Sequence, residues 1–173
     1  VIKFWGIYPD YIRQAFTYTF TAGLADPNKR IIENEWQKLF TRLRAEIVSC
    51  QCGRTTFLSA FENLGDTTYR CQRCGTQFPT LSFSNVDYRI PIYQNARLYA
   101  CITETACDDF SRITGEVIEN RLKKGMLGIR NMSDKVWDVK MPDGNFYHID
   151  YEKGFPIWED LEIKFGDITA KIK

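Results

Sequence analysis

Four cysteines in two tight pairs constrain this chain more than any other feature. Cys50 and Cys52 are separated by one residue, and Cys71 and Cys74 by two. A glycine directly follows each pair, and glycine permits the positive φ that a metal-binding turn often needs. Eighteen residues separate the two pairs, which leaves room for a β-hairpin that brings the second turn to the first. The spacing therefore predicts one site with four sulfur ligands.

The ligand set indicates which metal we expect. Four thiolates without a histidine favour tetrahedral Zn²⁺ and fill its coordination sphere. A filled sphere leaves no position for water, so the prediction is one structural zinc ion that replaces a core which about 30 residues cannot build. Buried free thiols are the plain alternative. A redox dithiol at Cys71 and Cys74 is a further alternative, although nothing places this pair at a helix start after a strand.

The other two cysteines stand apart from the cluster. Cys101 lies in the apolar run "LYACI", which predicts a buried small side chain in a strand. Cys107 lies in a polar loop, where we expect a free thiol. Because the tight pairs suit chelation better than disulfides, the cysteines indicate a reducing, cytoplasmic compartment.

Charge and hydrophobicity exclude several classes of protein. Hydrophobic residues make up 44% of the chain, which is enough for packed cores. The 23 basic and 22 acidic side chains nearly cancel, so charge gives no argument for nucleic acid or an anionic membrane as an obligatory partner. No apolar run approaches the roughly 18 to 20 residues of a membrane span. The start "VIKFWGIYPD" has neither an initiator Met nor a signal-peptide layout, and we expect an excised fragment of a longer soluble protein.

Hydrophobic periodicity predicts an α+β chain of three modules. Residues 1–48 show two apolar helical stripes, which indicate a helical hairpin that lacks a complete core and must pack on something else. Residues 49–83 form the cysteine region, expected to be a zinc ribbon. Residues 84–173 contain about seven short alternating runs with turn signals such as "PDGN", which predict an antiparallel β-sandwich.

The sequence shows no catalytic constellation. His148 is the only histidine, and it alternates with aromatic residues in a predicted strand without a serine or cysteine motif nearby. "KKGMLGIRN" has two glycines but no phosphate-binding pattern. We therefore expect that this chain is not an enzyme.

The N-terminal region resembles the end of a protein-kinase C-lobe. "GLADPNKRIIENEW" matches the kinase pattern Asp-Pro-x-x-Arg-Pro-Thr-x-x-Glu at Asp26, Pro27, Arg30 and Glu35, and Trp36 also fits. Two isoleucines replace the usual Pro and Thr. The glycine-rich loop, the catalytic lysine, the catalytic loop and the Asp-Phe-Gly motif are absent from the sequence, so the resemblance implies no kinase activity for this chain alone.

The order of the three modules resembles bacterial serine/threonine kinases found with a PP2C-type phosphatase and a von Willebrand A-domain protein, the tellurium-resistance-associated triad. The cysteine pairs and "GIRNMSDKVW…PDG" carry this resemblance. It implies a regulatory module that docks the A-domain protein, with the phosphatase as a further possible partner. Such A-domains often hold a divalent metal that accepts a partner's carboxylate. The candidate docking residues are therefore loop acids with two aromatic anchors: Asp108, Asp109, Asp134, Glu159, Asp160, Phe155 and Trp158.

The last module resembles a forkhead-associated (FHA) sandwich through its ending "GFPIWEDLEIKFG". FHA domains read phosphothreonine, but their Gly-Arg, Ser-x-x-His and Asn-Gly-Thr motifs are not cleanly present. An FHA-like phosphopeptide module therefore remains an alternative function. It would use an anion site formed by converging basic loops, as opposed to scattered solvated charges: Arg112, Arg121, Lys123, Lys124 and Arg130.

A nucleic-acid-binding ribbon is the other alternative. It would combine cations with aromatic side chains on one face of the cysteine region, diluted by Glu62 and Asp66. The candidate residues for this face are Arg54, Arg70, Arg73, Phe57, Tyr69 and Phe78.

Overall fold

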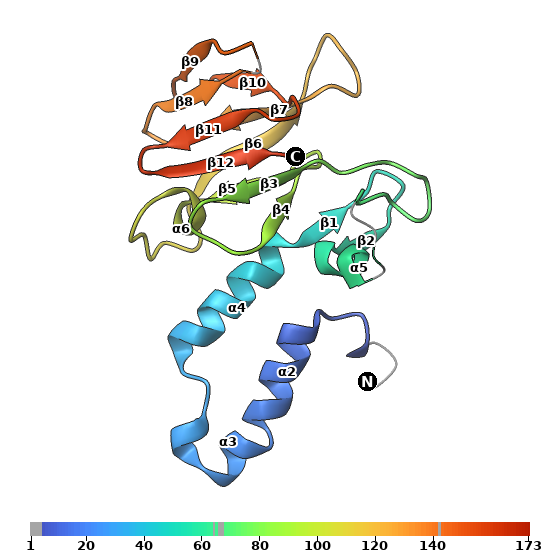
Figure 1. The fold of residues 1–173 in the computed structure, drawn as a ribbon, viewed down its shortest axis with the longest axis vertical. Helices are drawn as coiled ribbons and strands as arrows, with labels where there is room; N and C mark the ends of the chain where they lie inside the picture. Colours follow the sequence, from blue (N-terminus) through green and yellow to red (C-terminus); the bar gives the residue numbers. More distant parts are fainter. Residues whose placement is uncertain (1–4, 64, 66–67, 142) are drawn as a thin grey trace. The chain divides into compact units, whose positions relative to one another are not determined.

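The chain divides into two compact units, residues 1–76 and 77–173, which are described separately (Figure 1). Unit 1 carries helices and the cysteine region, and unit 2 carries antiparallel sheets. The α+β class is thus confirmed. The computed structural model describes residues 5–63, 65, 68–141 and 143–173.

In the described part of unit 1, four helical segments form the predicted hairpin. Side chains define two of the helix starts. The Asp26 carboxylate accepts a hydrogen bond from the Asn28 N–H at 3.0 Å, and the Glu35 carboxylate accepts one from the Ile32 N–H at 3.3 Å. Both satisfy N–H groups that lack an intrahelical partner. The segments are α2 (Asp10–Thr19), α3 (Ala22–Ala25), the 3-10 helix η1 (Pro27–Lys29) and α4 (Glu33–Ala45).

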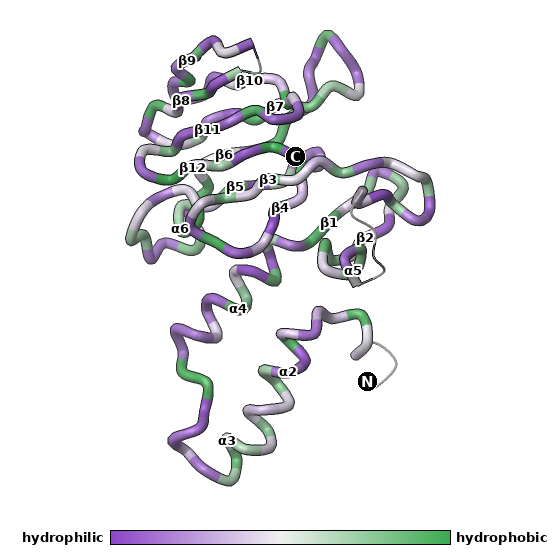
Figure 2. Tube along the Cα trace, in the orientation of Figure 1, coloured by the Kyte–Doolittle hydropathy of each residue, from purple (hydrophilic) through white to green (hydrophobic). Residues whose placement is uncertain are grey.

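The helices of unit 1 meet through aromatic rings rather than through a closed core. The Phe16 and Trp36 ring centroids are 5.0 Å apart, and those of Trp36 and Phe40 are 5.4 Å apart. Every described side chain of α4 keeps at least partial exposure, and the trace of α4 mixes hydrophilic and hydrophobic residues (Figure 2). Phe20 at the end of α2 is 64% exposed. The expectation of an incomplete core agrees with this packing.

The cysteine region continues directly from α4. β1 (Ile47–Ser49) and β2 (Thr55–Phe57) form an antiparallel hairpin, and α5 (Leu58–Asn63) follows. The segment between the cysteine pairs therefore holds β2 and α5 instead of the expected β-hairpin. Leu58 and Phe61 explain the helix, because both are buried. They supply apolar side chains that a short two-stranded ribbon lacks.

Unit 2 contains two antiparallel sheets. The six-stranded sheet runs in the order β4 (Arg89–Pro91), β3 (Thr80–Phe83), β12 (Ile168–Ile172), β11 (Glu162–Phe165), β8 (Trp137–Lys140) and β9 (Phe146–Ile149). The four-stranded sheet runs in the order β10 (Gly154–Pro156), β7 (Leu127–Asn131), β6 (Ile113–Glu119) and β5 (Arg97–Tyr99).

The sequence analysis did not predict three short strands of unit 2, namely β3, β10 and β12. β3 pairs with both β12 and β4, so the predicted end of the cysteine region at residue 83 lies inside the sheet. The run "LYACI" was expected to lie in a strand. Instead β5 ends at Tyr99 and a short helix, α6 (Ala100–Thr103), follows.

Trp137 joins the two sheets. Its ring lies 4.7 Å from the Phe165 ring in an edge-to-face arrangement. A Cβ at Gly115 on β6 would lie 2.8 Å from the Trp137 ring, so only glycine fits there. The Trp137 indole N–H donates to the Ser133 hydroxyl at 3.1 Å. This packing buries the Trp137 side chain without leaving its polar atom unpaired.

The loops of the four-stranded sheet gather at two opposite ends. We call them the Arg112 end, where β6 begins, and the Leu122 end, where β6 runs into the 120–126 loop. β7 is antiparallel to β6, so the 132–136 connection lies at the Arg112 end. β10 is antiparallel to β7, which places residues 157–160 at the Leu122 end.

Candidate functional site

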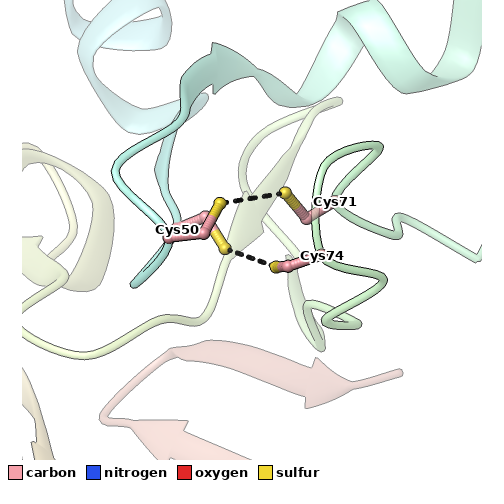
Figure 3. Close-up of side chains that lie close together, drawn as sticks. Cys50, Cys71 and Cys74 are labelled. Carbon is pink, nitrogen blue, oxygen red and sulfur yellow. Dashed lines mark hydrogen bonds between the residues drawn. The ribbon is translucent and has the colours of Figure 1, made fainter.

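The four predicted cysteines form one cluster. Their Sγ atoms all lie within 4.8 Å of one another. Cys50 Sγ is 3.4 Å from Cys74 Sγ, and Cys52 Sγ is 3.6 Å from Cys71 Sγ. Figure 3 shows the sulfur atoms of Cys50, Cys71 and Cys74 turned toward one another. Each close contact joins one pair to the other, and the cluster can hold one metal ion.

In each cysteine turn, the glycine after the pair closes the turn with a backbone hydrogen bond, which spans three residues in the first turn and four in the second. The Gly53 N–H donates to the Cys50 carbonyl at 2.9 Å, and the Gly75 N–H donates to the Cys71 carbonyl at 2.7 Å. Both glycines have positive φ, +83° and +75°, as the sequence predicted. The first turn connects β1 to β2, which fixes its orientation.

The thiols sit in unequal electrostatic surroundings. Burial raises the pKa of Cys50 to about 12. The hydroxyl of Thr76 lowers the pKa of Cys74 to about 6, and backbone N–H groups, that of Arg73 first, lower the pKa of Cys71. A bound dication would favour the thiolate form at every position. The donor set of four sulfurs suits Zn²⁺ better than the hard cations, which prefer oxygen.

The predicted nucleic-acid face does not form as expected. Tyr69 and Phe78 are 6% and 4% exposed, so their rings are not available for base stacking. Arg73 donates to the Cys52 carbonyl at 3.1 Å, and Arg54 donates to the Gln72 amide oxygen at 3.2 Å. These two arginines therefore tie the cysteine turns together. The remaining candidates are the exposed Arg70 and the half-buried Phe57.

A second candidate site is a hollow of about 640 Å³ at the Arg112 end of unit 2. Arg112 donates to both oxygens of Glu104, at 2.8 and 3.1 Å. Lys135 donates to the same carboxylate at 2.8 Å. These two cations lower the pKa of Glu104, Arg112 having the larger effect. The hollow is lined by Glu104, Arg112, Ile113, Met132, Ser133, Asp134, Lys135 and Tyr151.

The loop beside this hollow is held by a buried polar network. The Asn131 amide donates to the Lys135 carbonyl at 2.7 Å and to the Ile149 carbonyl at 2.8 Å. Its oxygen accepts the Ser133 N–H at 2.8 Å. Asn131 and Ser133 are both buried. The network fixes the backbone that presents Asp134 and Lys135.

The predicted docking residues fall at both ends. Asp134 and Asp109 lie at the Arg112 end, beside Asp108. Asp109 accepts hydrogen bonds from the Ser111 and Arg112 N–H groups at 2.9 Å, and these bonds, Ser111 first, lower its pKa. The other candidates, Phe155, Trp158, Glu159 and Asp160, belong to β10 and the connection after it.

Phe155 is 5% exposed, so it packs in the core and does not serve as a surface anchor. Alternation along β10 places it inward, a detail that the missed strand concealed. Trp158 is 48% exposed and stays available. Glu159 and Asp160 are exposed beside it.

The five predicted anion-binding cations do not converge. Arg112 lies at one end of β6, whereas Arg121, Lys123 and Lys124 follow its other end. Arg130 lies on β7, where its guanidinium pairs with the Glu116 carboxylate at 2.5 Å. Strand direction therefore separates these cations, which favours the alternative of scattered charges over one shared anion site.

Three remaining candidates have local roles. His148 Nδ1 lies 2.6 Å from the Asp138 carboxylate, its cross-strand neighbour on β8. Cys107 Sγ accepts a hydrogen bond from Arg112 at 3.6 Å. Cys101 lies in α6 and is only half-buried, so the prediction of a buried strand residue was wrong.

Of the eight residues that line the hollow, sequence reasoning named only Arg112 and Asp134. Among those that it missed are the paired charges Glu104 and Lys135. They are 31 positions apart, and each reads as an isolated loop charge. They come together because the β7–β8 turn lies next to the segment that follows α6. The sequence could have revealed this pair only if it had predicted that these two connections are neighbours in the fold.

No protein-family model matches the chain, and no curated protein matches it significantly. Within the described part of the chain, every helix is too short or too polar to span a bilayer.

Proposed function

We propose that this chain is a non-catalytic docking module of a bacterial serine/threonine kinase system, with one structural zinc ion in unit 1. The kinase-like sequence "GLADPNKRIIENEW" and the order of the modules support the kinase assignment. The four-cysteine cluster supports the zinc ion, because four thiolates saturate a tetrahedral metal and leave no position for a substrate.

The hollow at the Arg112 end is the observation that carries the docking role. Its rim combines the Asp134 carboxylate with Tyr151, an aromatic residue that is 56% exposed. The Asn131 network holds the rim in place before binding, so little conformational entropy would be lost when a partner docks. A rigid concave surface with an exposed aromatic residue is typical of a protein-binding site.

The proposed partner is the von Willebrand A-domain protein that the family resemblance implies. A carboxylate that such a partner's metal would accept must be exposed and not already occupied by cations. Asp134 meets this requirement better than Glu104, which Arg112 and Lys135 neutralise. Asp109 is bound to its own turn. We therefore propose that the Asp134 carboxylate binds the metal ion of the A-domain partner. Asp108 is the second candidate for this contact.

Binding of the zinc-loaded chain to the purified A-domain protein tests this function. Isothermal titration with Mg²⁺ present is expected to show a complex at micromolar concentrations, and Asp134→Asn should weaken it at least tenfold. Glu159→Gln, at the other end of the sandwich, is the matched control and should bind normally. If two folded proteins form no complex, the docking proposal is wrong. If Asp134→Asn binds the A-domain protein as tightly as the wild type does, the partner contacts another surface of the chain.

A further inference from the structure

The most exposed large apolar side chain in the described part of the chain lies at the Leu122 end of unit 2. Leu122 is 94% exposed, and it stands between Arg121 and the Lys123–Lys124 pair. The loop that carries it connects β6 to β7 and is mostly hydrophilic along its trace (Figure 2). A leucine held in water among three cations contributes nothing to the core of its own chain.

Hydrogen bonds within the loop hold this leucine in place. The Asn120 side-chain oxygen accepts the Leu122 N–H at 2.8 Å and the Lys123 N–H at 3.1 Å. The Gly125 N–H donates to the Glu119 carboxylate at 2.6 Å. The Asn120 N–H donates to the Met126 carbonyl at 2.8 Å, which closes the base of the loop. The tip is thus ordered before any contact forms, which reduces the entropy cost of docking.

A complementary surface lies beside this tip. The Ile157 N–H donates to the Leu127 carbonyl at 3.1 Å, which joins the connection after β10 to the base of the loop. The next three residues are Trp158, which is 48% exposed, and the exposed carboxylates Glu159 and Asp160. Lys171 pairs with Asp160 at 3.2 Å, so Glu159 contributes most of the negative charge. One end of unit 2 therefore presents a basic tip with a leucine next to an acidic turn with a tryptophan.

We propose that the Leu122 end is a homodimer interface in which a second copy of this chain docks across a two-fold axis. A two-fold axis places the basic tip of each copy on the acidic turn of the other. Leu122 then covers the Trp158 ring of the partner, while Lys123 and Lys124 approach the partner's Glu159. Each contact occurs twice, and the apolar centre is surrounded by opposite charges. This arrangement matches the usual anatomy of an interface, an apolar core with a polar rim.

Charge distinguishes a second copy from the other possible occupants. An anionic membrane would attract the basic tip but repel the acidic turn. A purely acidic protein would have the same conflict. A second copy satisfies both charges with one surface. The contact area is small, so we expect a weak dimer with a Kd on the order of 10 to 100 µM that weakens as salt screens the charges.

A charge-swap experiment with the full zinc-loaded chain tests the proposal. Analytical ultracentrifugation from about 5 to 500 µM should show a monomer–dimer equilibrium for the wild type, since this range spans the expected Kd. The double variants K123E/K124E and E159K/D160K should each raise Kd at least tenfold, because their interfaces become acid-on-acid and base-on-base. An equimolar mixture of the two should dimerise again. Lys153→Glu, at the Arg112 end, is the control that should leave Kd unchanged.

Each alternative outcome would overturn the proposal. A wild type that stays monomeric throughout the range excludes the dimer. Double variants that associate like the wild type, or a mixture that fails to regain association, place the contact elsewhere. If the wild type is monomeric and co-sediments with vesicles of phosphatidylcholine and phosphatidylserine, the basic tip binds an anionic membrane and not a second copy of the chain. Circular dichroism checks that all variants are folded, which is expected because every substituted side chain is exposed.

Discussion

The two units of this chain reach a stable fold by different means. Among the described residues, unit 2 buries 21 apolar side chains and unit 1 buries only eight. Two of those eight, Cys50 and Cys71, belong to the metal cluster itself. Unit 2 closes two sheets around Trp137, whereas unit 1 leaves its helices in contact through half-exposed rings. The difference indicates that unit 2 depends on hydrophobic burial, and it supports the proposal that a metal ion at the four-cysteine cluster stabilises unit 1.

Loss of one cluster ligand should produce the largest effect and should be confined to unit 1. Cys71→Ser removes a buried thiolate, and structural zinc contributes about 10 kcal/mol or more to small metal domains. We expect loss of the metal and proteolytic sensitivity of residues 1–76, while unit 2 keeps its near-ultraviolet dichroism. Metal analysis and limited proteolysis measure both. Cys107→Ser, the same change outside the cluster, should keep one zinc per chain. Full metal content in Cys71→Ser would mean that another ligand set is in use.

A change in the core of unit 2 should have the opposite effect: it should destabilise unit 2 and leave the metal content of unit 1 unchanged. Trp137→Ala removes the side chain that joins the two sheets and should cost about 3 to 5 kcal/mol of unfolding free energy. The zinc content should not change. Denaturant unfolding together with metal analysis checks both, and the exposed Trp158→Ala should change stability by less than about 0.5 kcal/mol. Zinc loss in Trp137→Ala would show that the two units do not fold independently.

Strain in one cysteine turn should weaken metal binding without abolishing it. Gly75 has φ of +75°, a conformation that costs a residue with a Cβ roughly 1 to 2 kcal/mol. Gly75→Ala should therefore lower zinc affinity about 5- to 30-fold, measured by competition with a chromophoric chelator. Gly6→Ala, in the same unit but without a positive φ, is the control. An unchanged affinity would mean that the turn relaxes when the metal binds.

A smaller and pH-dependent effect is expected at the hollow of unit 2. Arg112 and Lys135 lower the pKa of Glu104 below its ordinary 4.5, so the ionised carboxylate stabilises the fold at neutral pH. Glu104→Gln should cost about 1 to 3 kcal/mol there. The loss should shrink as the pH falls below 4.5 and through the lowered pKa, because wild-type Glu104 then protonates. A difference that stays constant with pH would assign the effect to packing.

The sequence alone was sufficient to predict the features that depend on local chemistry. Cysteine spacing identified all four members of the cluster, and the glycine after each pair indicated the positive φ that Gly53 and Gly75 adopt. Apolar periodicity found the helical hairpin and the β-rich region. Each of these signals lies within a few neighbouring residues.

Features that depend on the pairing of distant segments were not accessible from the sequence. β3 pairs with β12, and the paired residues Phe83 and Ala170 are 87 positions apart, so no local signal marked this pairing. The sequence left open whether the five basic residues form one anion site or are scattered charges, and only the direction of β6 placed Arg112 and Arg121 at opposite ends. Phe155 looked like an exposed anchor because β10 had not been recognised. The ion pairs of Glu104 likewise depend on two loops that the sheets bring together.

Hydrogen exchange before and after metal removal tests the central claim most directly. The zinc-loaded chain is compared with the same chain after treatment with a strong chelator, and peptides from both units are followed by mass spectrometry. We expect one zinc ion per chain before treatment. After treatment, peptides of residues 1–76 should lose protection, while those of β6, β8 and β11 should keep it. Unchanged protection in both units, or the absence of zinc from a folded unit 1, would contradict the account.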